Sequence, residues 1–372
     1  MRILLMIDTL GSGGAQRQII SLAKALCVKG HEVTLLYYNG PHYFLSHIKD
    51  LPIRVEFVQK KSKIGWGLFW QIRSFIKANS FDIACSFMIA PSLFLLVGNR
   101  LAGRKVKCII SERTFEAGVS NLHKKFRLSY HFADYILANS SHQQAVLKEL
   151  FPNYVNRIRS IGNGVFLNEF NYRKDYVFSS DKLHIVAIGR IVVLKNIRTL
   201  ISALNILVNN FKVNAYVAYV GREPVIREDV AEQEMCLQLL KEFHLEERWT
   251  WVGEVNNVDQ YLEQNDVLVH TSFGEGFPNA VCEAMIKGIP VFASNVCDHP
   301  KVIEHGKSGY LFDPRNAEEL AAFLYQFHHL TLEEKRKMVA EARSFAEKNF
   351  DIEVVATKYE SLFKSLLSEN HS

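Results

Sequence analysis

The sequence predicts an α/β fold made of two doubly wound domains in succession, with a ligand cleft between them at the carboxyl ends of their strands. Short apolar runs alternate with amphipathic segments of helical length along the chain. This series starts again after a polar segment at residues 168–182, which we interpret as a linker. With 372 residues, the chain is also too long for one ordinary hydrophobic core.

The first half, residues 1–170, is predicted to form a parallel sheet with helical crossovers. Its expected strands are Arg2–Ile7, Glu32–Tyr38, Arg54–Val58, Asp82–Phe87, Val106–Ser111 and Tyr135–Ala138. Its expected helices are Ala15–Lys29, Trp66–Ala78 and Ser141–Leu150, with another helix beginning near Pro91. Proline suits the first turn of a helix, where its missing N–H costs nothing.

The second half, residues 180–350, repeats the pattern and predicts a second domain of the same class. Its expected strands are Leu183–Gly189, Ala215–Val220, Thr250–Val252, Val267–His270 and Pro290–Ala293. Its expected helices are Ile197–Asn209, Val230–Phe243 and Asn279–Lys287. The tail, Asp351–Ser368, has helical periodicity and could pack across either domain.

The segments near the start and the cysteines indicate a cytoplasmic protein. The first ten residues fit a strand and are too short for a signal peptide. The longest uncharged stretch, Ile83–Asn99, contains Pro91 and is too short to span a membrane. Six cysteines, at positions 27, 85, 108, 236, 282 and 297, show neither C-x-x-C pairing nor metal-site spacing, so we expect them to be reduced and buried.

Charge is divided unevenly between the two halves. Residues 1–173 contain 23 Lys and Arg against 10 Asp and Glu, whereas residues 174–372 contain 21 against 29. A basic first half and an acidic second half support two domains, and they predict that the first half meets an anionic partner.

A basic and aromatic segment, Lys60–Trp70, has two interpretations. Lysines followed by exposed tryptophans suit an anionic membrane surface, and Lys107, Lys124, Lys125 and Arg127 add positive charge. Alternatively, the segment is a helix whose Trp and Phe face the core while its lysines are solvated. Nucleic acid is the weaker expectation, because no recognised binding motif accompanies the charge.

Two carboxylates, Glu275 and Glu283, lie eight positions apart around Gly276, Phe277 and Pro278. An apolar strand precedes them and a helix is expected to follow from Asn279. A helix N-terminus offers free N–H groups and a positive dipole end, which suit a diphosphate, while the carboxylates can accept from sugar and ribose hydroxyls. The alternative is a pair of structural glutamates on an ordinary crossover, and spacing alone does not decide between the two.

Cations and glycines follow the first strand of each predicted domain. Gly189-Arg190 and Lys195-Asn196 place an Arg and a Lys where they can bind phosphate oxygens, although isolated surface cations are commonly only solvated. In the first domain, Gly11–Arg17 includes Gly13 and Gly14 and leads into a helix, which fits either a phosphate loop or a tight turn. It does not match the G-x-G-x-x-G fingerprint of dinucleotide-binding proteins.

The fifth predicted strand of the first domain ends in Ser111-Glu112-Arg113-Thr114. Glu112 or Arg113 could contact a sugar or an acceptor, and an ion pair at a strand end is the alternative. Asn163–Val165 is interpreted as a turn with a hinge role. No Asp-x-Asp sequence and no His/carboxylate cluster with metal spacing occurs in the chain, so we expect no metal and no other cofactor.

Together, and in this order, these motifs resemble the retaining glycosyltransferases of family 4 with the GT-B fold, and the likeness covers nearly the whole chain. The matching segments are Gly11–Arg17, Gly189-Arg190, Lys195-Asn196, Glu275 to Glu283 and Gly288–Val291. One departure concerns Arg113, which takes the place where many members carry a histidine near the sugar.

The resemblance implies two Rossmann-like domains, with the last helix, 351–372, completing the first, and a metal-free transfer from a nucleotide sugar, usually UDP-linked. The residues it assigns to the donor are Gly13, Gly14, Gly189, Arg190, Lys195, Glu275, Gly276, Phe277, Pro278, Asn279 and Glu283. Those it assigns to catalysis are Glu275, Arg190 and Lys195, with Arg113 in the histidine's place.

The expected function is therefore transfer of a hexose or N-acetylhexosamine from a UDP-sugar, with retention, to a lipid-linked or surface-polysaccharide acceptor. The resemblance is strongest to bacterial O-antigen, capsule and lipid-linked oligosaccharide enzymes, which places the protein on the cytoplasmic face of an anionic inner membrane. A UDP-sugar epimerase or phosphorylase of the same fold, or a non-catalytic nucleotide-sugar-binding subunit, is the alternative.

Overall fold

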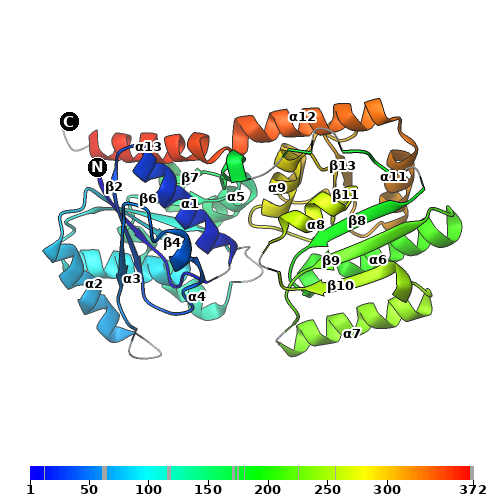
Figure 1. The fold of residues 1–372 in the computed structure, drawn as a ribbon. Coiled ribbons are helices and arrows are strands. Elements are labelled where there is room, and N and C mark those ends of the chain that lie inside the picture. Colours follow the sequence, from blue (N-terminus) through cyan, green and yellow to red (C-terminus); the bar gives the residue numbers. More distant parts are fainter. Residues whose placement is uncertain are drawn as a thin grey trace. The chain divides into compact units, whose positions relative to one another are not determined.

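The computed structural model describes residues 1–372 except for 12, 61–64, 115–118, 170–171, 174–175, 180, 225, 256 and 369–372. The chain forms two compact units. The first contains Met1–Phe166 and Phe350–Ser372, and the second contains Leu167–Asn349. Each unit is built on one parallel sheet with helices on its faces, which confirms the predicted fold class (Figure 1).

The sheet of the first unit has seven strands in the order β3-β2-β1-β4-β5-β6-β7. The strands are β1 (Arg2–Met6), β2 (Glu32–Tyr37), β3 (Ile53–Phe57), β4 (Ile83–Phe87), β5 (Lys107–Glu112), β6 (Tyr135–Ala138) and β7 (Ile158–Ser160). The first six agree with prediction to within one residue at either end. β7 was not predicted, because three residues at a sheet edge are too short to show a period.

Two layers of helices cover the two faces of this sheet. One face packs against α1 (Gly14–Val28) and α13 (Ile352–Ser368). The other face packs against α2 (Trp66–Ala78), α3 (Ile89–Leu101) and α5 (Ser141–Leu150). The short helix α4 (Asn121–Phe126) and the 3₁₀ helix η3 (Arg127–Phe132) lie against α3 on that second face.

Helix α13 belongs to the first unit although it comes last in the chain. Val165 N donates to Phe350 O at 2.8 Å, and Ile352 N donates to Val165 O at 2.9 Å. The helix then lies beside α1 (Figure 1). Its Tyr359 and Phe363 side chains are buried in the same cluster as α1. A Cβ on Gly164 would lie 2.8 Å from Ile352 Cα, so this junction requires glycine.

The sheet of the second unit has six strands in the order β10-β9-β8-β11-β12-β13. The strands are β8 (Leu183–Ile188), β9 (Ala215–Val220), β10 (Trp249–Gly253), β11 (Val267–His270), β12 (Val291–Ser294) and β13 (Tyr310–Phe312). The helices are α6 (Ile197–Asn205), α7 (Arg227–Glu242), α8 (Asp259–Gln264), α9 (Asn279–Lys287), α10 (His299–Val302), α11 (Ala317–His329) and α12 (Leu332–Phe350). A π-helical turn, Ile206–Asn210, continues α6 and accounts for the longer helix that the sequence predicted there.

The segment interpreted as a linker, 168–182, lies partly outside the described residues. Its described part is attached to the second unit. The Arg173 guanidinium donates to the carbonyls of Leu262 and Asn265 at 2.6 and 2.7 Å, and Tyr176 Oη donates to Asp266 Oδ1 at 2.8 Å. The described portion is therefore part of a packed surface.

Four of the six cysteines agree with the expectation that these side chains are buried, and two do not. All six cysteines are unpaired; Cys27 and Cys297 are half-buried and the other four are buried. Burial raises the pKa of the Cys85 thiol to about 12, so it is protonated at neutral pH. Among the helices of the described residues, none is both long and apolar enough to cross a bilayer.

Replacing Phe363 by alanine should destabilise the first unit. The side chain is fully buried between α13 and α1, so the substitution leaves a cavity, and a loss of about 4 kcal/mol in the free energy of unfolding is expected. Thermal or urea unfolding measures this loss. Lys358→Ala, on the exposed side of the same helix, serves as the control and should change stability little. An equally small effect of Phe363→Ala would show that α13 is not part of that core.

Candidate active site

The second unit places two predicted site residues at the middle of its sheet. β8 and β11 are neighbours, and the chain leaves them in opposite directions, toward β9 and toward β12. Such a reversal opens a crevice at the carboxyl ends of the two strands, where ligands bind in doubly wound sheets. Lys195 follows β8 and Glu275 follows β11, so both lie at this crevice.

Hydrogen bonds to main-chain carbonyls join the loops that carry these two residues. Thr271 Oγ1 donates to Lys195 O at 2.8 Å, and Phe273 N donates to Leu194 O at 2.9 Å. Asn196 Nδ2 donates to Thr271 O at 3.1 Å. Asn196 has a φ of +51°, in the left-handed region that asparagine tolerates better than most residues. Lys195 is thereby turned toward the loop that contains Glu275.

One oxygen of Glu275 accepts from three side chains. Lys195 Nζ lies 2.5 Å, Ser272 Oγ 2.7 Å and His270 Nε2 2.8 Å from Glu275 Oε1. Within the part of the chain that the structure describes, the second oxygen, Oε2, has no hydrogen-bond partner, and the side chain is 15% exposed. The carboxylate is therefore anchored through Oε1 and offers Oε2 as an acceptor.

The contacts also fix the protonation state of this cluster. Burial raises the pKa of Glu275, but Lys195 and His270 outweigh it and hold that pKa well below its usual range. Burial and the nearby Lys195 charge lower the pKa of His270. At neutral pH, Glu275 is thus ionised and His270 is uncharged, with its Nε2–H donating to the carboxylate.

Arg190 and Gly189 lie at the carboxyl end of β8. Arg190 is exposed, and no described residue accepts a hydrogen bond from its guanidinium, which leaves it available to an anion. The Lys195 side chain passes close to Gly189, where a Cβ would be 3.0 Å from Lys195 Cε. A Cβ on Gly221, at the end of β9, would be 1.7 Å from Gly189 O, so glycine is required at position 221.

The segment from Gly276 to Glu283 forms a loop and the start of α9. Pro278 precedes the helix without a side-chain cap, and Asn279 is its first residue. Asn279 N donates to Phe277 O at 3.0 Å, so the N–H groups that this end can offer to an anion are those that follow Asn279 in the first turn. Glu283 lies within α9 and is 9% exposed. Phe277 continues the loop from Gly276, between Glu275 and the helix.

In the first unit, Gly13 and Gly14 lie where β1 leads into α1. Gly14 is the first residue of α1, and Gly13 precedes it with extended backbone angles. A Cβ on Gly13 would lie 2.3 Å from Gln16 Oε1, so a side chain there would displace Gln16. Ser12, between the glycines of this loop, lies outside the described residues.

Arg113 makes several contacts within the first unit. Its guanidinium donates to Asn163 Oδ1, to Tyr359 Oη at 2.9 Å and, through Nε, to Ser111 Oγ at 3.0 Å. The guanidinium carbon also lies 3.9 Å from the centroid of the Phe87 ring. These contacts tie the end of β5 to α13 and to the turn that contains Asn163. The role of Arg113 toward a sugar stays a prediction.

Glu112 and Arg127 are not available to a ligand, which corrects two expectations. Glu112 is 1% exposed and Arg127 is 4% exposed, and the two form a bidentate ion pair. Tyr130 Oη and Gln143 Nε2 also donate to the Glu112 carboxylate, at 2.6 and 3.2 Å. Arg127 therefore neutralises a buried carboxylate and adds no positive charge to the surface.

The alternative interpretation of the basic aromatic segment is wrong for its tryptophans. Trp66 and Trp70 are 68% and 59% exposed, while Leu68, Ile72 and Ile76 supply the buried side of α2. Residues 61–64 of this segment lie outside the described residues.

Sequence reasoning gave no role to two residues that hold Glu275, His270 and Ser272, and it named Asn196 only as part of the Lys195-Asn196 motif. His270 ends a buried strand, and a polar residue at the carboxyl end of an apolar run is a signal that could have been used. Ser272 has no comparable signal, although its partners, His270 and Glu275, lie on the same loop. Among the described residues, no group of His, Cys, Asp and Glu has the arrangement of a metal site.

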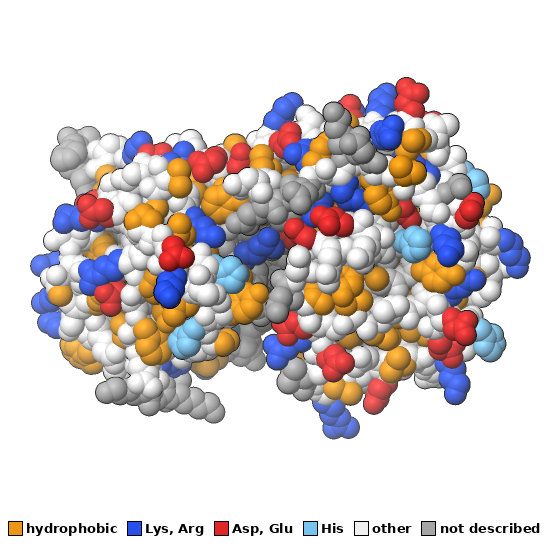
Figure 2. Space-filling model, viewed as in Figure 1, with side chains coloured by type: hydrophobic (Ala, Val, Ile, Leu, Met, Phe, Trp, Pro, Cys, Tyr) orange, Lys and Arg blue, Asp and Glu red, His pale blue; other side chains and the backbone are white. Residues whose placement is uncertain are grey.

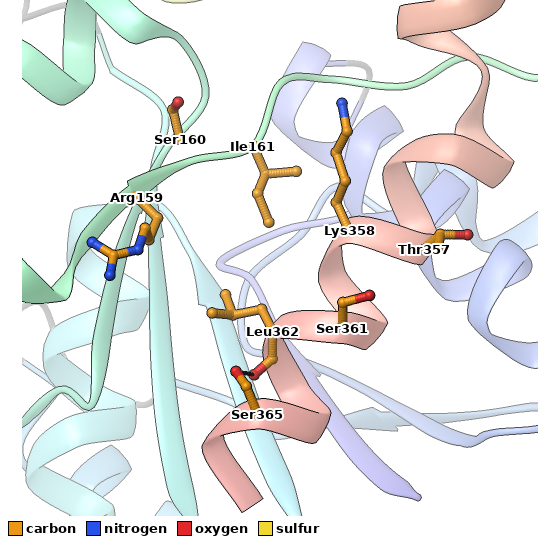
Figure 3. A pocket seen from close by; sticks show the side chains of 8 residues that line it. All are labelled: Arg159, Ser160, Ile161, Thr357, Lys358, Ser361, Leu362 and Ser365. Carbon is orange, nitrogen blue, oxygen red and sulfur yellow. Dashed lines mark hydrogen bonds between the residues drawn. The ribbon is translucent and has the colours of Figure 1, made fainter. Parts of the chain in front are cut away.

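A shallow pocket of about 460 Å³ lies between β7 and α13. Figure 3 shows its serine hydroxyls together with Ile161 and Leu362, while the Arg159 and Lys358 side chains point in different directions. Its polar groups do not converge, so the pocket has no resemblance to a catalytic centre.

Two protein-family models match the two halves of the chain. The model of "Glycosyltransferase Family 4" matches residues 12–169, and the model of "Glycosyl transferases group 1" matches residues 168–345. Together they cover nearly the whole chain, with the Glu275 cluster inside the second match.

Two curated relatives are bacterial glycosyltransferases. The Campylobacter jejuni GalNAc-α-(1→4)-GalNAc-α-(1→3)-diNAcBac-PP-undecaprenol α-1,4-N-acetyl-D-galactosaminyltransferase is 26% identical over 77% of each chain. The amylovoran biosynthesis glycosyltransferase AmsD of Erwinia amylovora is 25% identical over 97% of this chain and 99% of its own. Among solved structures, Anabaena Alr3699/HepE in complex with UDP superposes with a TM-score of 0.82 at 18% identity, covering 98% of this chain and all of that one.

The depressed pKa of Glu275 should appear in the pH dependence of stability. Above the pKa of an unfolded glutamate the ionised side chain stabilises the folded state, and this stabilisation is lost as pH falls toward the lower folded-state pKa. Below about pH 5, the free energy of unfolding should therefore fall more steeply for the wild type than for Glu275→Gln, measured by urea unfolding. Glu333→Gln controls for net charge. Equal slopes for wild type and Glu275→Gln would contradict the assigned ion pair.

Proposed function

This chain is a glycosyltransferase of family 4 with the GT-B fold, and we propose that it transfers a hexose or N-acetylhexosamine from a UDP-sugar, with retention, to a lipid-linked or surface-polysaccharide acceptor. The observation that carries the proposal is the anchored Glu275 carboxylate beside Lys195, at the crevice between β8 and β11. The Anabaena neighbour with UDP bound and the Campylobacter relative named for an undecaprenol-linked substrate support the donor and the acceptor.

In the proposed donor complex, the diphosphate is held by Arg190, by Lys195 and by the N-terminus of α9. Lys195 is paired with Glu275 in the present structure, so an arriving diphosphate competes with the carboxylate for the ammonium group. His270 and Ser272 continue to hold Oε1 when Lys195 turns toward the phosphate. Glu275 can then accept from a sugar hydroxyl through Oε2, while Glu283 accepts from the ribose.

The proposed reaction is a displacement on one face of the sugar. The acceptor hydroxyl oxygen forms a bond to the anomeric carbon as the bond from that carbon to the diphosphate breaks. The acceptor proton passes to the leaving diphosphate, and Arg190 and Lys195 stabilise the negative charge that develops there. The absence of side chains at Gly13 and Gly14 would let a ligand approach the backbone of the first unit closely.

The acceptor is assigned to the first unit. Its excess of positive charge suits an acceptor that carries phosphate, and a lipid-linked acceptor would keep the protein at the cytoplasmic face of the inner membrane.

Lys195→Ala and Glu283→Ala should each reduce transfer by about a hundredfold or more while the protein stays folded, because each removes a charged group that holds the donor. Transfer of radiolabelled sugar from UDP-sugars to membrane extract measures this. Lys358→Ala is a matched control outside the crevice and should keep full activity. Full activity of both crevice variants would refute the site assignment. Conversion of the UDP-sugar alone would identify an epimerase, and conversion that requires added phosphate would identify a phosphorylase.

Removal of divalent metal should not reduce transfer. The proposed site stabilises the leaving diphosphate with Arg190, Lys195 and a helix N-terminus, so protein groups supply the charge that Mg²⁺ or Mn²⁺ gives elsewhere. The measurement is the initial rate with and without EDTA after dialysis. A large loss that added Mn²⁺ restores would overturn the metal-free mechanism.

A further inference from the structure

Asp8 is a half-buried carboxylate of the first unit to which the proposed reaction gives no role. It follows β1 by two residues, and β1 lies between β2 and β4 in the sheet. The chain leaves β1 toward β2 and leaves β4 toward β5, so the strand order reverses between β1 and β4. In doubly wound sheets, such a reversal opens a crevice at the carboxyl ends of the two strands, where ligands bind. Asp8 therefore lies at the crevice of the first unit.

One oxygen of Asp8 is held by its neighbours in the fold. Thr9 N donates to Asp8 Oδ1 at 2.8 Å, and Gln16 Nε2 donates to the same oxygen at 3.4 Å. The main-chain carbonyl of Asp8 accepts from Asn39 N at 2.8 Å, which ties the residue to the segment that follows β2. Within the described residues, the second carboxylate oxygen, Oδ2, accepts no hydrogen bond. Asp8 is thus anchored through one oxygen and offers the other to a donor, as Glu275 does in the second unit.

No cation of the described structure forms an ion pair with Asp8. Elsewhere in this unit, carboxylates are commonly paired, and Figure 2 shows acidic side chains next to basic ones on its surface. The pairs are Glu56 with Arg54, Asp82 with Arg2, Glu112 with Arg127, Asp134 with Lys107 and Glu360 with Lys364. Burial raises the pKa of Asp8, and the hydrogen bonds from Thr9 and Gln16, together with the nearby His123, lower it by less. The ionised side chain therefore costs stability that the described contacts do not offset.

The local backbone does not need this charge. An asparagine at position 8 would accept from Thr9 N and Gln16 Nε2 through its side-chain carbonyl, because these contacts use one oxygen only. A partly desolvated charge without a cation, located at a crevice, is typical of a group that acts on a ligand.

Aromatic side chains adjoin the segment that holds Asp8. Thr9 Oγ1 donates to Pro41 O at 2.8 Å, which joins the residue after Asp8 to the residue before His42. The His42 ring is exposed, and its centroid lies 5.5 Å from that of Phe57, the 46% exposed last residue of β3. A sugar presents hydroxyls at its edge and C–H groups on its faces. An acceptor oxygen next to exposed rings offers a complement to both.

We propose that Asp8 binds a non-reacting hydroxyl of the acceptor sugar, so that the acceptor enters this crevice as a saccharide and not as a phosphate. This inference rests on the proposed function, because it specifies the acceptor of that transfer. A hydroxyl that donates to ionised Oδ2 forms a stronger hydrogen bond than one between neutral groups. A phosphate at the same place would be repelled by the carboxylate, so the phosphate of a lipid-linked acceptor would lie away from Asp8.

Saccharide binding in the absence of donor tests the proposal separately from transfer. The probes are the methyl glycosides of glucose, galactose, N-acetylglucosamine and N-acetylgalactosamine, titrated by saturation-transfer NMR. The wild type should bind at least one of them. Asp8→Asn should weaken that binding by about tenfold, because it exchanges a charged acceptor for a neutral one. Glu149→Gln removes an exposed carboxylate on α5 and is the matched control, which should bind like the wild type.

Deoxy analogues of the bound glycoside identify the hydroxyl that donates to Asp8. Removing that hydroxyl should weaken binding to the wild type by about tenfold and should weaken binding to Asp8→Asn much less, because the two changes remove the same interaction. Equal losses in the two proteins for every deoxy analogue would show that no hydroxyl donates to Asp8.

Kinetics and stability separate a binding role from a structural one. With the bound glycoside as acceptor, Asp8→Asn should raise the acceptor KM by about tenfold and leave the donor KM unchanged. The amide also removes an unpaired charge, so the variant should be at least as stable as the wild type in urea unfolding. A variant that binds glycoside poorly and is also less stable would identify a structural role for Asp8.

Two further results would overturn the proposal: binding of no probe to the wild type, or unchanged glycoside binding in Asp8→Asn. The proposed function can fail separately. Glycoside binding that depends on Asp8, in a protein that transfers no sugar from any UDP-sugar, would support this inference and refute the transfer. Transfer with an unchanged acceptor KM in Asp8→Asn would support the transfer and refute this inference.

Discussion

The ion pair between Lys195 and Glu275 joins the two loops that border the crevice of the second unit, and the candidate site depends on it. The ion pair itself is short, but it exists because two loops from non-adjacent parts of the sequence are joined through main-chain carbonyls. Asn196 accepts an uncommon backbone conformation to make one of these contacts. As a result, Oε1 of Glu275 accepts three hydrogen bonds, whereas Oε2 accepts none within the described structure. A hydroxyl can therefore donate to this carboxylate only from the side of Oε2.

The sequence predicted most of the central architecture. Apolar strands such as Glu32–Tyr37 and Val267–His270 were located closely, because residues buried on both faces form continuous apolar runs. β7 and β13 were missed, because each has three residues and depends on a neighbouring strand for its pairing. The helix Ile352–Ser368 was predicted from its periodicity. Periodicity shows that one face of a helix is apolar, but it does not show which unit that face packs against.

The candidate site was predictable in part. Glu275, Glu283, Arg190 and Lys195 carry chemistry that is recognisable from residue type and spacing. The contacts of Arg113 were not predictable, because its acceptors, Asn163 and Tyr359, lie 50 and 246 positions away. The burial of Glu112 was not predictable either, because its partner is distant in the sequence. From sequence alone, that partner, Arg127, was expected to add positive charge to the surface.

The path of the chain has a consequence for biosynthesis. The first unit is made of Met1–Phe166 and Phe350–Ser372, with the entire second unit encoded between them. A nascent chain therefore completes the second unit before α13 emerges to cover α1. Until then, the apolar side of α1 is exposed to solvent, and the groups that will bind Tyr359 are exposed as well. The incomplete first unit is therefore the folding intermediate that is most prone to misfold and to bind chaperones. The order of synthesis thus makes the earliest segment of this protein the last to reach its final form.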